Sequence, residues 1–385
     1  MLAALLLAPF LWPTSPVQNQ DPAPQRELHC KLALSTDLGV EDRWYYTSWG
    51  LEVQIPASDR VFRHQFFGVY LFFTDYALTP EGLCSIEYDV SITRPDGSVF
   101  YENTGLPGFG GPVGSGESSL LSQQGVFACF EPEDPIGDYT VSVEVRDLIG
   151  ETSSVLSSVL TQAEYVEGAP FEDDELAYAA LFGPGRMPIV EQVIPAFLTI
   201  ARGSGWSSDG TKRGSFRAVF EANHWLLARL LQRYADQDEP TRRAILWLLA
   251  RSSFDGDDAG VRDLDPELWE ELASSGHDPL VDPIRGRTDV NELWGMYAVS
   301  HRFEPFLRLC LTLSTETGVV AEETLHVEDL GVDVPLSDVV RRVVESMLEE
   351  DLSRAPFSRE YGLFLSANEG IPPGVREALS RIYGD

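Results

Sequence analysis

The hydrophobic spacing of this chain changes once, near residue 164, and that change constrains the fold more than any other feature. Before it, apolar residues recur at every second position, which is the spacing of a strand with one buried face. After it, they recur at every third or fourth position, the spacing of an amphipathic helix. Sheets and helices bury their faces differently, so we expect separate cores: β structure first, then an all-α domain.

The clearest strand signal covers residues 83–93, where apolar and polar side chains alternate throughout. The next five residues, Arg94-Pro95-Asp96-Gly97-Ser98, predict a turn, and 99–101 then form the returning strand of a hairpin. The same alternation predicts a strand at 139–145. Further strands are expected at 28–34, 44–53, 66–73, 126–130 and 155–162. Short strands separated by turn signals predict an antiparallel β-sandwich over residues 28–163.

Two segments of this region carry a resemblance. They are the turn at 94–98 and the stretch 132–141, in which Gly137-Asp138-Tyr139 begins a late strand. Together they resemble the immunoglobulin-like and macroglobulin-type sandwiches of bacterial exported proteins. The resemblance implies an immunoglobulin-like fold for 28–163. It also implies that Tyr139 is a corner tyrosine, with a buried ring and a hydroxyl bonded to nearby backbone.

The second half begins after an acidic, Gly- and Pro-containing stretch, 164–187, which we interpret as a linker. Helix start signals recur near residues 265, 288, 304, 337 and 372. Short connections between helices predict antiparallel helical hairpins over 188–385. The segment 289–313 resembles helical hairpins of uncharacterised bacterial exported proteins, and no activity follows from that resemblance.

The start of the chain predicts export. Residues 2–12 form an apolar run that is too short to span a bilayer but has the length of a secretory signal core. We therefore expect a signal peptide at 1–18, a linker at 19–27, and a periplasmic or secreted protein with no transmembrane segment in the mature chain. No Lys or Arg precedes the run, so an upstream start codon or a retained anchor stays open.

Charge and cysteines bear on partners and on redox state. The net charge of -33 repels phosphate backbones, so we expect no nucleic-acid partner and favour another envelope or secreted protein. An oxidising compartment would favour one disulfide, and Cys84 with Cys129 is the preferred pair because both lie on expected strands. Buried free thiols are the alternative.

Two Glu-x-x-His motifs are the candidate metal site. Glu221 with His224, and Glu323 with His326, would each place a carboxylate and an imidazole on one helical face, as di-metal helical bundles require. Glu191 and Glu292 are the available further ligands, one from each of two other helices. The alternative for His224, which lies among apolar residues, is a hydrogen-bonded core histidine.

An aromatic cluster gives a second candidate site. On an extended strand, Trp44 and Trp49 could form a platform for sugar rings, and packing of these rings in the β core is the alternative. We find no nucleophile elbow, and the pair His277-Asp278 before Pro279 is interpreted as a turn. We expect no cofactor. The leading hypothesis is a non-enzymatic exported binding or scaffolding protein. The alternatives are a metal-dependent enzyme with its site in the helical domain, and a carbohydrate-binding module.

Overall fold

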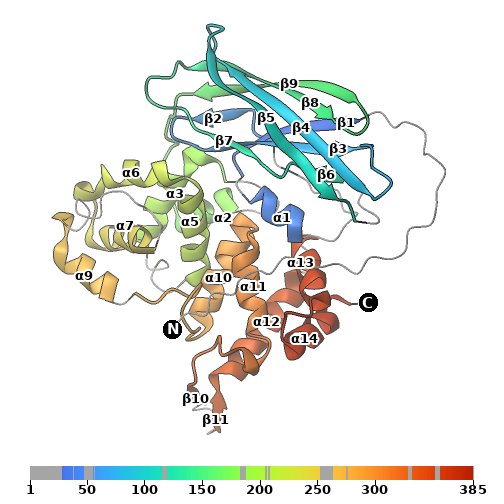
Figure 1. Cartoon of the computed structure of the whole chain (residues 1–385). Coiled ribbons are helices and arrows are strands. Elements are labelled where there is room, and N and C mark those ends of the chain that lie inside the picture. The colour runs from blue at the N-terminus through green and yellow to red at the C-terminus, as the bar shows by residue number, and fades with distance from the viewer. Residues whose placement is uncertain are drawn as a thin grey trace.

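The structure is a computed structural model, and β-sheets come first in the chain and helices follow (Figure 1). It describes residues 28–37, 39–46, 55, 57–114, 119–182, 188–203, 206, 209–251, 263–274, 276–327, 332–351 and 356–384. The expected signal peptide, 1–18, and the linker at 19–27 lie outside these residues. Within them, no helix combines the length and the apolar composition needed to cross a membrane.

The β region contains two sheets. In the first, β3 (Phe67–Thr74) pairs antiparallel with three other strands: β1 (His29–Ser35), β6 (Ser119–Leu121) and β7 (Val126–Ala128). The second has the order β2-β9-β8-β4-β5: β2 (Arg60–Phe62), β4 (Leu83–Thr93), β5 (Val99–Pro112), β8 (Gly137–Asp147) and β9 (Thr152–Ala163). The β2–β9 pair is parallel, unlike the antiparallel pairing expected throughout.

Local chemistry explains two details of the β region that the sequence predicted. The N–H of Arg94 donates to the Ser98 carbonyl at 2.8 Å, and Gly97 adopts a φ of +86°, so the turn between β4 and β5 is confirmed. The Tyr139 ring is completely buried and its hydroxyl donates to the Pro135 carbonyl at 2.9 Å. The expected role of Tyr139 at the corner is confirmed.

Strand β3 is buried on both faces. Val69, Leu71 and Phe73 belong to one core with the inward residues of the second sheet, whereas Tyr70 and Phe72 face a smaller core with helix α1 (Val40–Tyr46). The strand expected at 44–53 is therefore wrong over residues 44–46, and 47–54 lie outside the described residues. Val40 and Trp44 are four positions apart, so a helix places both on the face that covers this sheet.

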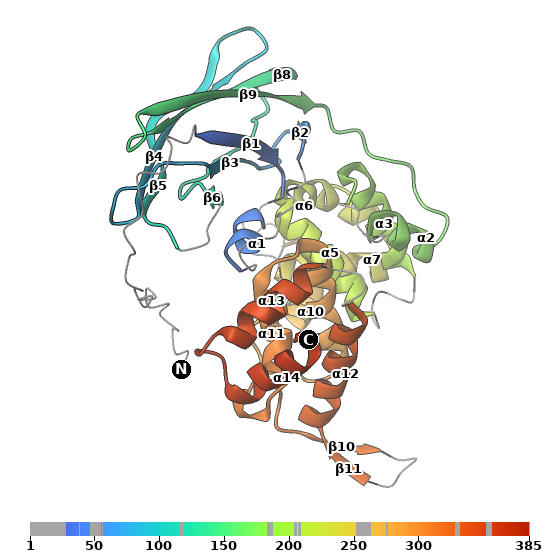
Figure 2. The same cartoon turned by 90° about the vertical axis from the view of Figure 1, so that its right-hand side faces the viewer.

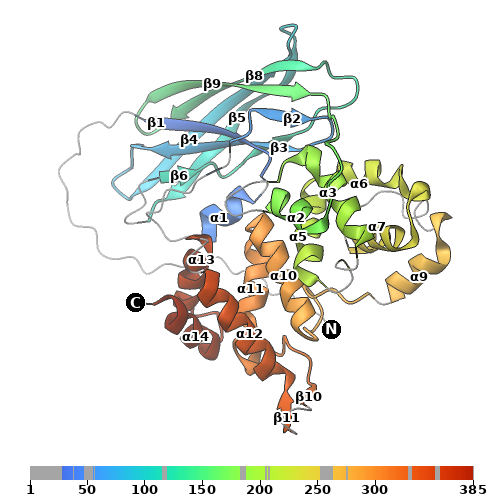
Figure 3. The same cartoon turned by 180° about the vertical axis from the view of Figure 1, so that it is seen from behind.

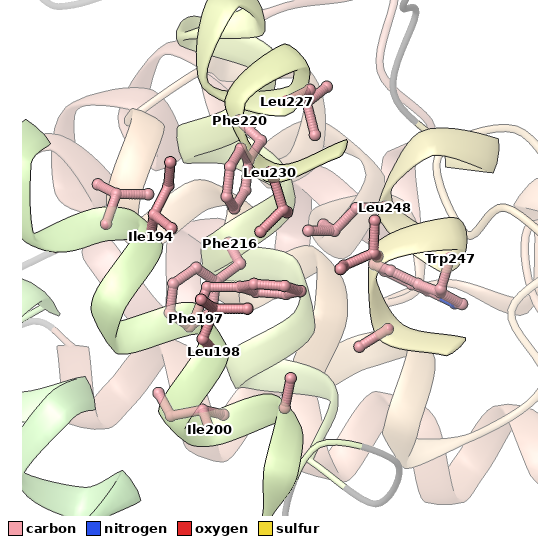
Figure 4. Packing of buried hydrophobic residues seen from close by; sticks show 14 of the residues in the cluster. Ile194, Phe197, Leu198, Ile200, Phe216, Phe220, Leu227, Leu230, Trp247 and Leu248 are labelled. Atoms are coloured by element: carbon pink, nitrogen blue, oxygen red, sulfur yellow. The ribbon is translucent and has the colours of Figure 1, made fainter. Parts of the chain in front are cut away.

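The helices form two groups (Figure 1), and each group surrounds its own apolar core. The first core is formed by α2 (Asp174–Phe182), α3 (Val190–Arg202), α5 (Gly210–Ala222), α6 (His224–Leu231), α7 (Glu239–Arg251) and α9 (Pro266–Ser274). Figure 4 shows its centre, where Phe197 of α3 meets Phe216 and Phe220 of α5, with ring centroids 5.5 Å apart in both pairs.

The second core is formed by the later helices. They are α10 (Arg287–Ser300), α11 (Phe303–Leu311), α12 (Leu336–Asp351), α13 (Pro356–Ala367) and α14 (Pro373–Tyr383). Two single-turn 3₁₀ helices, Tyr234–Asp236 and Thr315–Thr317, lie in connections. The helix starts expected near 265, 288, 304, 337 and 372 are all confirmed.

Two features of this half differ from expectation. Helix α2 lies inside the stretch 164–187 that we interpreted as a linker, and its Ala177 and Leu181 are completely buried in the first helical core. A β-hairpin, β10 (Thr324–Val327) with β11 (Val332–Pro335), interrupts the helices, so this half is not all-helical. The linker interpretation rested partly on acidic residues. In the structure, acidic residues occupy the first turn of α2, where the helix dipole favours them.

Helices α5 and α10 approach each other unusually closely. A Cβ atom on Gly214 would lie 1.9 Å from the Glu292 carbonyl oxygen, and one on Gly210 would lie 2.2 Å from that of Thr288. Gly295 gives the reciprocal contact, 2.2 Å from the Thr211 carbonyl oxygen. Because these glycines have no side chains, the two helix backbones come into direct contact. The α5–α10 pair thereby connects the two helical cores.

The β region is docked on the helices at two places (Figures 2 and 3). Tyr46, at the end of α1, stacks on Phe303 of α11 with ring centroids 3.9 Å apart. Phe62 of β2 packs against Trp225 of α6 at 6.0 Å. Nearby, the Gln65 amide donates to the Asn223 side-chain oxygen at 3.2 Å. The two halves thus share an apolar and hydrogen-bonded joint.

Candidate functional site

The strongest concentration of buried charge lies where α5, α10 and the loop 276–286 meet. Arg217 of α5 has a side chain only 4% exposed. Its two terminal nitrogens each donate to one oxygen of Asp278 at 2.8 Å, and its Nε donates to Glu221 at 2.9 Å. Glu292 of α10 lies 3.5 Å away on the other side. One guanidinium thus serves three carboxylates.

Burial and partners set the pKa values in this cluster. Burial would lower the pKa of Arg217, but hydrogen bonds to Asp278 and the charge of Glu221 outweigh it, so that pKa is raised. Burial would raise the pKa of Asp278, and the Arg217 hydrogen bonds reverse that and hold it below its ordinary value. Burial does raise the pKa of Glu292, against the opposing charges of Arg217 and Arg213.

A second layer of contacts fixes the loop. The Nε2 atom of His277 lies 2.7 Å from a carboxylate oxygen of Asp289, at the start of α10, and its Nδ1 lies 3.7 Å from one of Asp282. Arg308 of α11 donates to the main-chain carbonyls of Pro279, at 3.0 Å, and of Asp282. The loop 276–286 is therefore held by ionic or hydrogen-bonding groups from four helices, because Arg251 of α7 also donates to the His277 carbonyl at 3.0 Å.

The chemistry open to this cluster is limited. Its side chains are guanidinium, carboxylate and imidazole groups that already bind one another, and no serine or cysteine side chain contacts Arg217, Asp278 or Glu292 in the described part of the chain. Desolvating such groups costs free energy that only good pairing offsets. The arrangement positions a loop against α5 and α10 and shows no nucleophile.

The predicted metal ligands occupy other kinds of structure. Helix α5 ends at Ala222 and α6 begins at His224, with Asn223 at φ −134° between them, so Glu221 and His224 do not share a continuous helix. Glu221 instead accepts from Arg217 and from Arg302, the latter at 3.3 Å.

The second motif is not helical at all, because Glu323 precedes β10 and His326 lies on that strand. The helical geometry predicted for this motif is wrong, and the side chain of His326 lies outside the described residues. The further ligands are also engaged elsewhere: Glu191 pairs with Arg60 at 2.5 Å, and Glu292 lies in the ionic cluster. Over the described residues, no three His, Cys, Asp or Glu side chains form a group that could hold a metal ion.

The predicted aromatic platform changes character. Trp44 lies on helix α1, and its ring packs on Phe72 of β3 with centroids 5.1 Å apart. The side chain is half-buried in the small core behind the first sheet. Trp49 lies outside the described residues.

All four cysteines are free thiols in the structure, and the predicted Cys84–Cys129 disulfide is not formed. Cys84 is buried on β4, where burial and the charge of Asp147 raise its pKa to about 12. Cys129 is half-buried after β7, and burial together with Glu131 raises its pKa. Thiolate formation is disfavoured at both positions, which makes these cysteines poor nucleophiles.

Sequence reasoning passed over the ionic cluster. One signal was present: Arg217 and Glu221 are four residues apart, which brings their side chains together on a helix. The partners Asp278 and Glu292 are distant in sequence, and the pair His277-Asp278 was interpreted as a turn. The spacing of residues in a single sequence does not predict an ion pair between distant residues, because only packing of the chain brings them together.

Comparisons with known proteins add little to this geometry. No family model and no curated protein matches the chain. Among solved structures, a family 123 glycoside hydrolase from Clostridium perfringens matches 40% of this chain at 10% identity and a TM-score of 0.22, and the match spans 32% of that enzyme. A Niemann-Pick type C2 protein from Japanese carpenter ant (11% identity, 38% of this chain, 99% of that chain) also has a TM-score of 0.22.

A CARDB domain from Pyrococcus furiosus matches 39% of this chain at 10% identity, with all of that domain covered and a TM-score of 0.20. These scores support no argument about activity, ligand or partner. The description of the chain therefore rests on its own structure, in which sheets are followed by helices and a packed interface joins the two.

Proposed function

We propose that this chain is a non-enzymatic binding or scaffolding protein that works in the bacterial cell envelope or after secretion. In this proposal its β region is an immunoglobulin-like sandwich, fused to helical hairpins that contact another envelope or secreted protein. The buried tyrosine at the corner of β8 and the core shared by the two sheets support the sandwich assignment.

The observation that carries the proposal is the joint between the two halves. Stacking of Tyr46 on Phe303, packing of Phe62 on Trp225 and the Gln65–Asn223 hydrogen bond fix the β region on the helices. A scaffold needs parts that hold a constant distance and orientation, and packed aromatic rings from both halves oppose motion of one half relative to the other. The ionic cluster works in the same direction, because it fixes the loop 276–286 against α5 and α10.

Export is tested by attaching residues 1–27 to an alkaline phosphatase that becomes active only after its disulfides form outside the cytoplasm. We expect phosphatase activity in intact bacteria, because the apolar run 2–12 has the length of a signal core. Replacing Leu5 and Leu6 with Asp should abolish it. Equal activity from both fusions, or none from either, would contradict export through this segment.

Partner binding is tested by placing a photoreactive amino acid at exposed apolar positions in the native bacterium. Suitable positions are Val155 on β9, Leu176 on α2 and Val281 in the loop 276–286, which are 74%, 53% and 67% exposed. We expect at least one to give a single defined cross-linked protein that excess unlabelled chain displaces. If none exceeds the exposed polar position Glu175 of α2, the binding function is wrong.

The metal alternative has a direct measurement. Elemental analysis of the purified full chain should find less than one metal ion per chain, because Glu221 is already bound by two arginines. A stoichiometric metal that is lost in His224→Ala would favour the metal-dependent enzyme instead.

A further inference from the structure

Helix α1 begins close to the end of α10, and a buried charged group lies beside this contact. Arg43 of α1 has a side chain only 1% exposed and forms an ion pair with Asp37. Beside it, Gly39 lies so close to α10 that an added Cβ would be 3.1 Å from the Ser300 carbonyl oxygen. The same added Cβ would lie 3.5 Å from Arg43 Nη1, so the Arg43 guanidinium and the end of α10 meet at Gly39. Ser300 is one residue before His301, the C-cap of α10.

The position of His301 is fixed from several directions. It adopts a left-handed φ of 51°, its N–H donates to the Tyr297 carbonyl at 2.7 Å, and its own carbonyl accepts from the Tyr361 hydroxyl at 2.8 Å. The Tyr297 ring lies edge-on to the imidazole at 6.3 Å. With its backbone held by α10 and α13, the ring cannot move far from the joint.

The charges around this imidazole favour its neutral form. Burial, and then the Arg43 charge, lower the pKa of His301 to about 4, although the Asp37 charge opposes them. The neighbouring Arg302 is engaged by Glu221 and Glu304.

Helix α13, which packs against both α1 and α11, contributes the charged residues Arg359 and Glu360 beside Tyr361. Glu360 is itself buried. The groups that act on the pKa of His301 are nevertheless Arg43 and Asp37, both from the β region's side of the joint.

We propose that acidification loosens the docking of α1 on the helices, because a protonated His301 would share the joint with the buried Arg43 guanidinium. Two cations would then lie beside the carboxylate of Asp37. Separation of α1 from α10 rehydrates the imidazolium, so the undocked state binds the proton more tightly. The joint thereby acts as an acid-sensitive contact between the β region and the helices.

The direction in pH follows from linkage. An exposed histidine titrates near its ordinary pKa of about 6.5, whereas burial lowers the pKa of docked His301 to about 4. The docking of α1 is therefore strongest at pH values above the pKa of an exposed histidine. It is progressively lost as the pH falls from there towards the lower pKa of docked His301. Across that window the docking equilibrium should weaken by on the order of a hundredfold.

Hydrogen exchange of the full chain measures this directly. The Arg43 amide is bonded to the Gly39 carbonyl at 3.1 Å and reports on α1. After correction for the intrinsic exchange rate, we expect its protection to fall by on the order of a hundredfold between pH 7 and pH 4. In His301→Asn, which tolerates the left-handed conformation, the same protection should stay nearly constant.

Two further variants keep the test decisive. His64→Gln removes an exposed histidine that lies 3.5 Å from Glu131, and it should retain the full pH dependence. Arg43→Gln keeps the His301 imidazole but removes the neighbouring cation, so the pH dependence of the protection of α1 should become shallower. This variant supplies a test even if His301→Asn folds poorly. An unchanged protection of α1 in the wild type at pH 4, or an equal fall in the wild type and His301→Asn, would overturn the proposal.

Discussion

Among single residues, Arg217 shows how a buried charge can be tolerated in a helical core. A guanidinium carries donors in a fixed planar fork, which matches the two oxygens of a carboxylate. Asp278 occupies that fork, Glu221 takes the Nε donor and Glu292 approaches from α10. Removing the guanidinium would leave three carboxylates close together with little solvent to replace it.

Arg217→Met tests this balance. The substitution should lower the free energy of unfolding by about 3–5 kcal/mol, because it breaks a buried network and leaves Asp278 without its bidentate partner. Urea denaturation at pH 7 measures the change. The matched control is Arg302→Met: that arginine is 41% exposed while binding the same Glu221, so its loss should cost about 1 kcal/mol or less. Equal losses in the two variants would contradict the argument.

A more exposed pair on β4 and β8 gives a pH-dependent counterpart. Both nitrogens of Arg146 donate to Asp89 at 2.6 Å, and these hydrogen bonds lower the pKa of Asp89 to about 2. A carboxyl group whose pKa is lowered in the folded protein stabilises the fold at pH values above its ordinary pKa. This contribution is lost as the pH falls through the lowered pKa.

Asp89→Asn should therefore destabilise the protein at pH 7 by about 1 kcal/mol, a value discounted for the partial exposure of both side chains. The difference from the wild type should shrink as pH falls from 4 to 2. Chemical denaturation at several pH values follows it. A difference that is independent of pH would show that the carboxylate charge contributes nothing.

Among the secondary-structure elements, the α5–α10 contact depends most sharply on residue size. Gly214→Ala would drive a methyl group into the Glu292 carbonyl, at 1.9 Å, so the helices must separate. We expect a loss of at least about 3 kcal/mol, more than the helix-propensity gain of an alanine can offset. Thermal unfolding monitored by circular dichroism measures it.

Gly286→Ala is the control for that substitution. Gly286 precedes α10, and an added Cβ there would meet nothing within 4 Å. This variant should unfold within about 0.5 kcal/mol of the wild type. A comparable loss in both variants would mean that glycine flexibility, and not close packing, matters at Gly214.

The elements also show where sequence patterns succeed and where they stop. Strands β4 and β8 could be predicted because one face of each is buried and the other is exposed to solvent, so apolar and polar residues alternate along them. Helix α1 was mistaken for a strand because its aromatic residues favour strands, while the sheet that it covers is formed by residues distant in sequence. The hairpin β10–β11 was missed because the segment from Glu323 to His326 was interpreted as a helical Glu-x-x-His motif.

For the whole molecule, the joint decides whether the two halves behave as one unit. Tyr46→Ala removes the ring that stacks on Phe303 and also approaches Phe364 at 5.5 Å. We expect a loss of about 2 kcal/mol or more, together with a broader calorimetric transition, because the β region and the helices then unfold less cooperatively.

The adjacent tyrosine supplies the control. Tyr45 is 52% exposed on the same helix, so Tyr45→Ala should change stability by no more than about 0.5 kcal/mol and leave the transition sharp. If the two variants broaden the transition equally, the stacking of Tyr46 does not couple the halves.

The sequence by itself determined the order of structure: strands, a turn with Gly97 at positive φ, then helices that start near the expected residues. These features follow from contacts between neighbours along the chain, which a single sequence contains. Only the tertiary structure decided that α1 covers a sheet, that Arg217 meets Asp278 and Glu292, and that His301 lies near Arg43. Those contacts join distant segments, and packing rather than local spacing selects them.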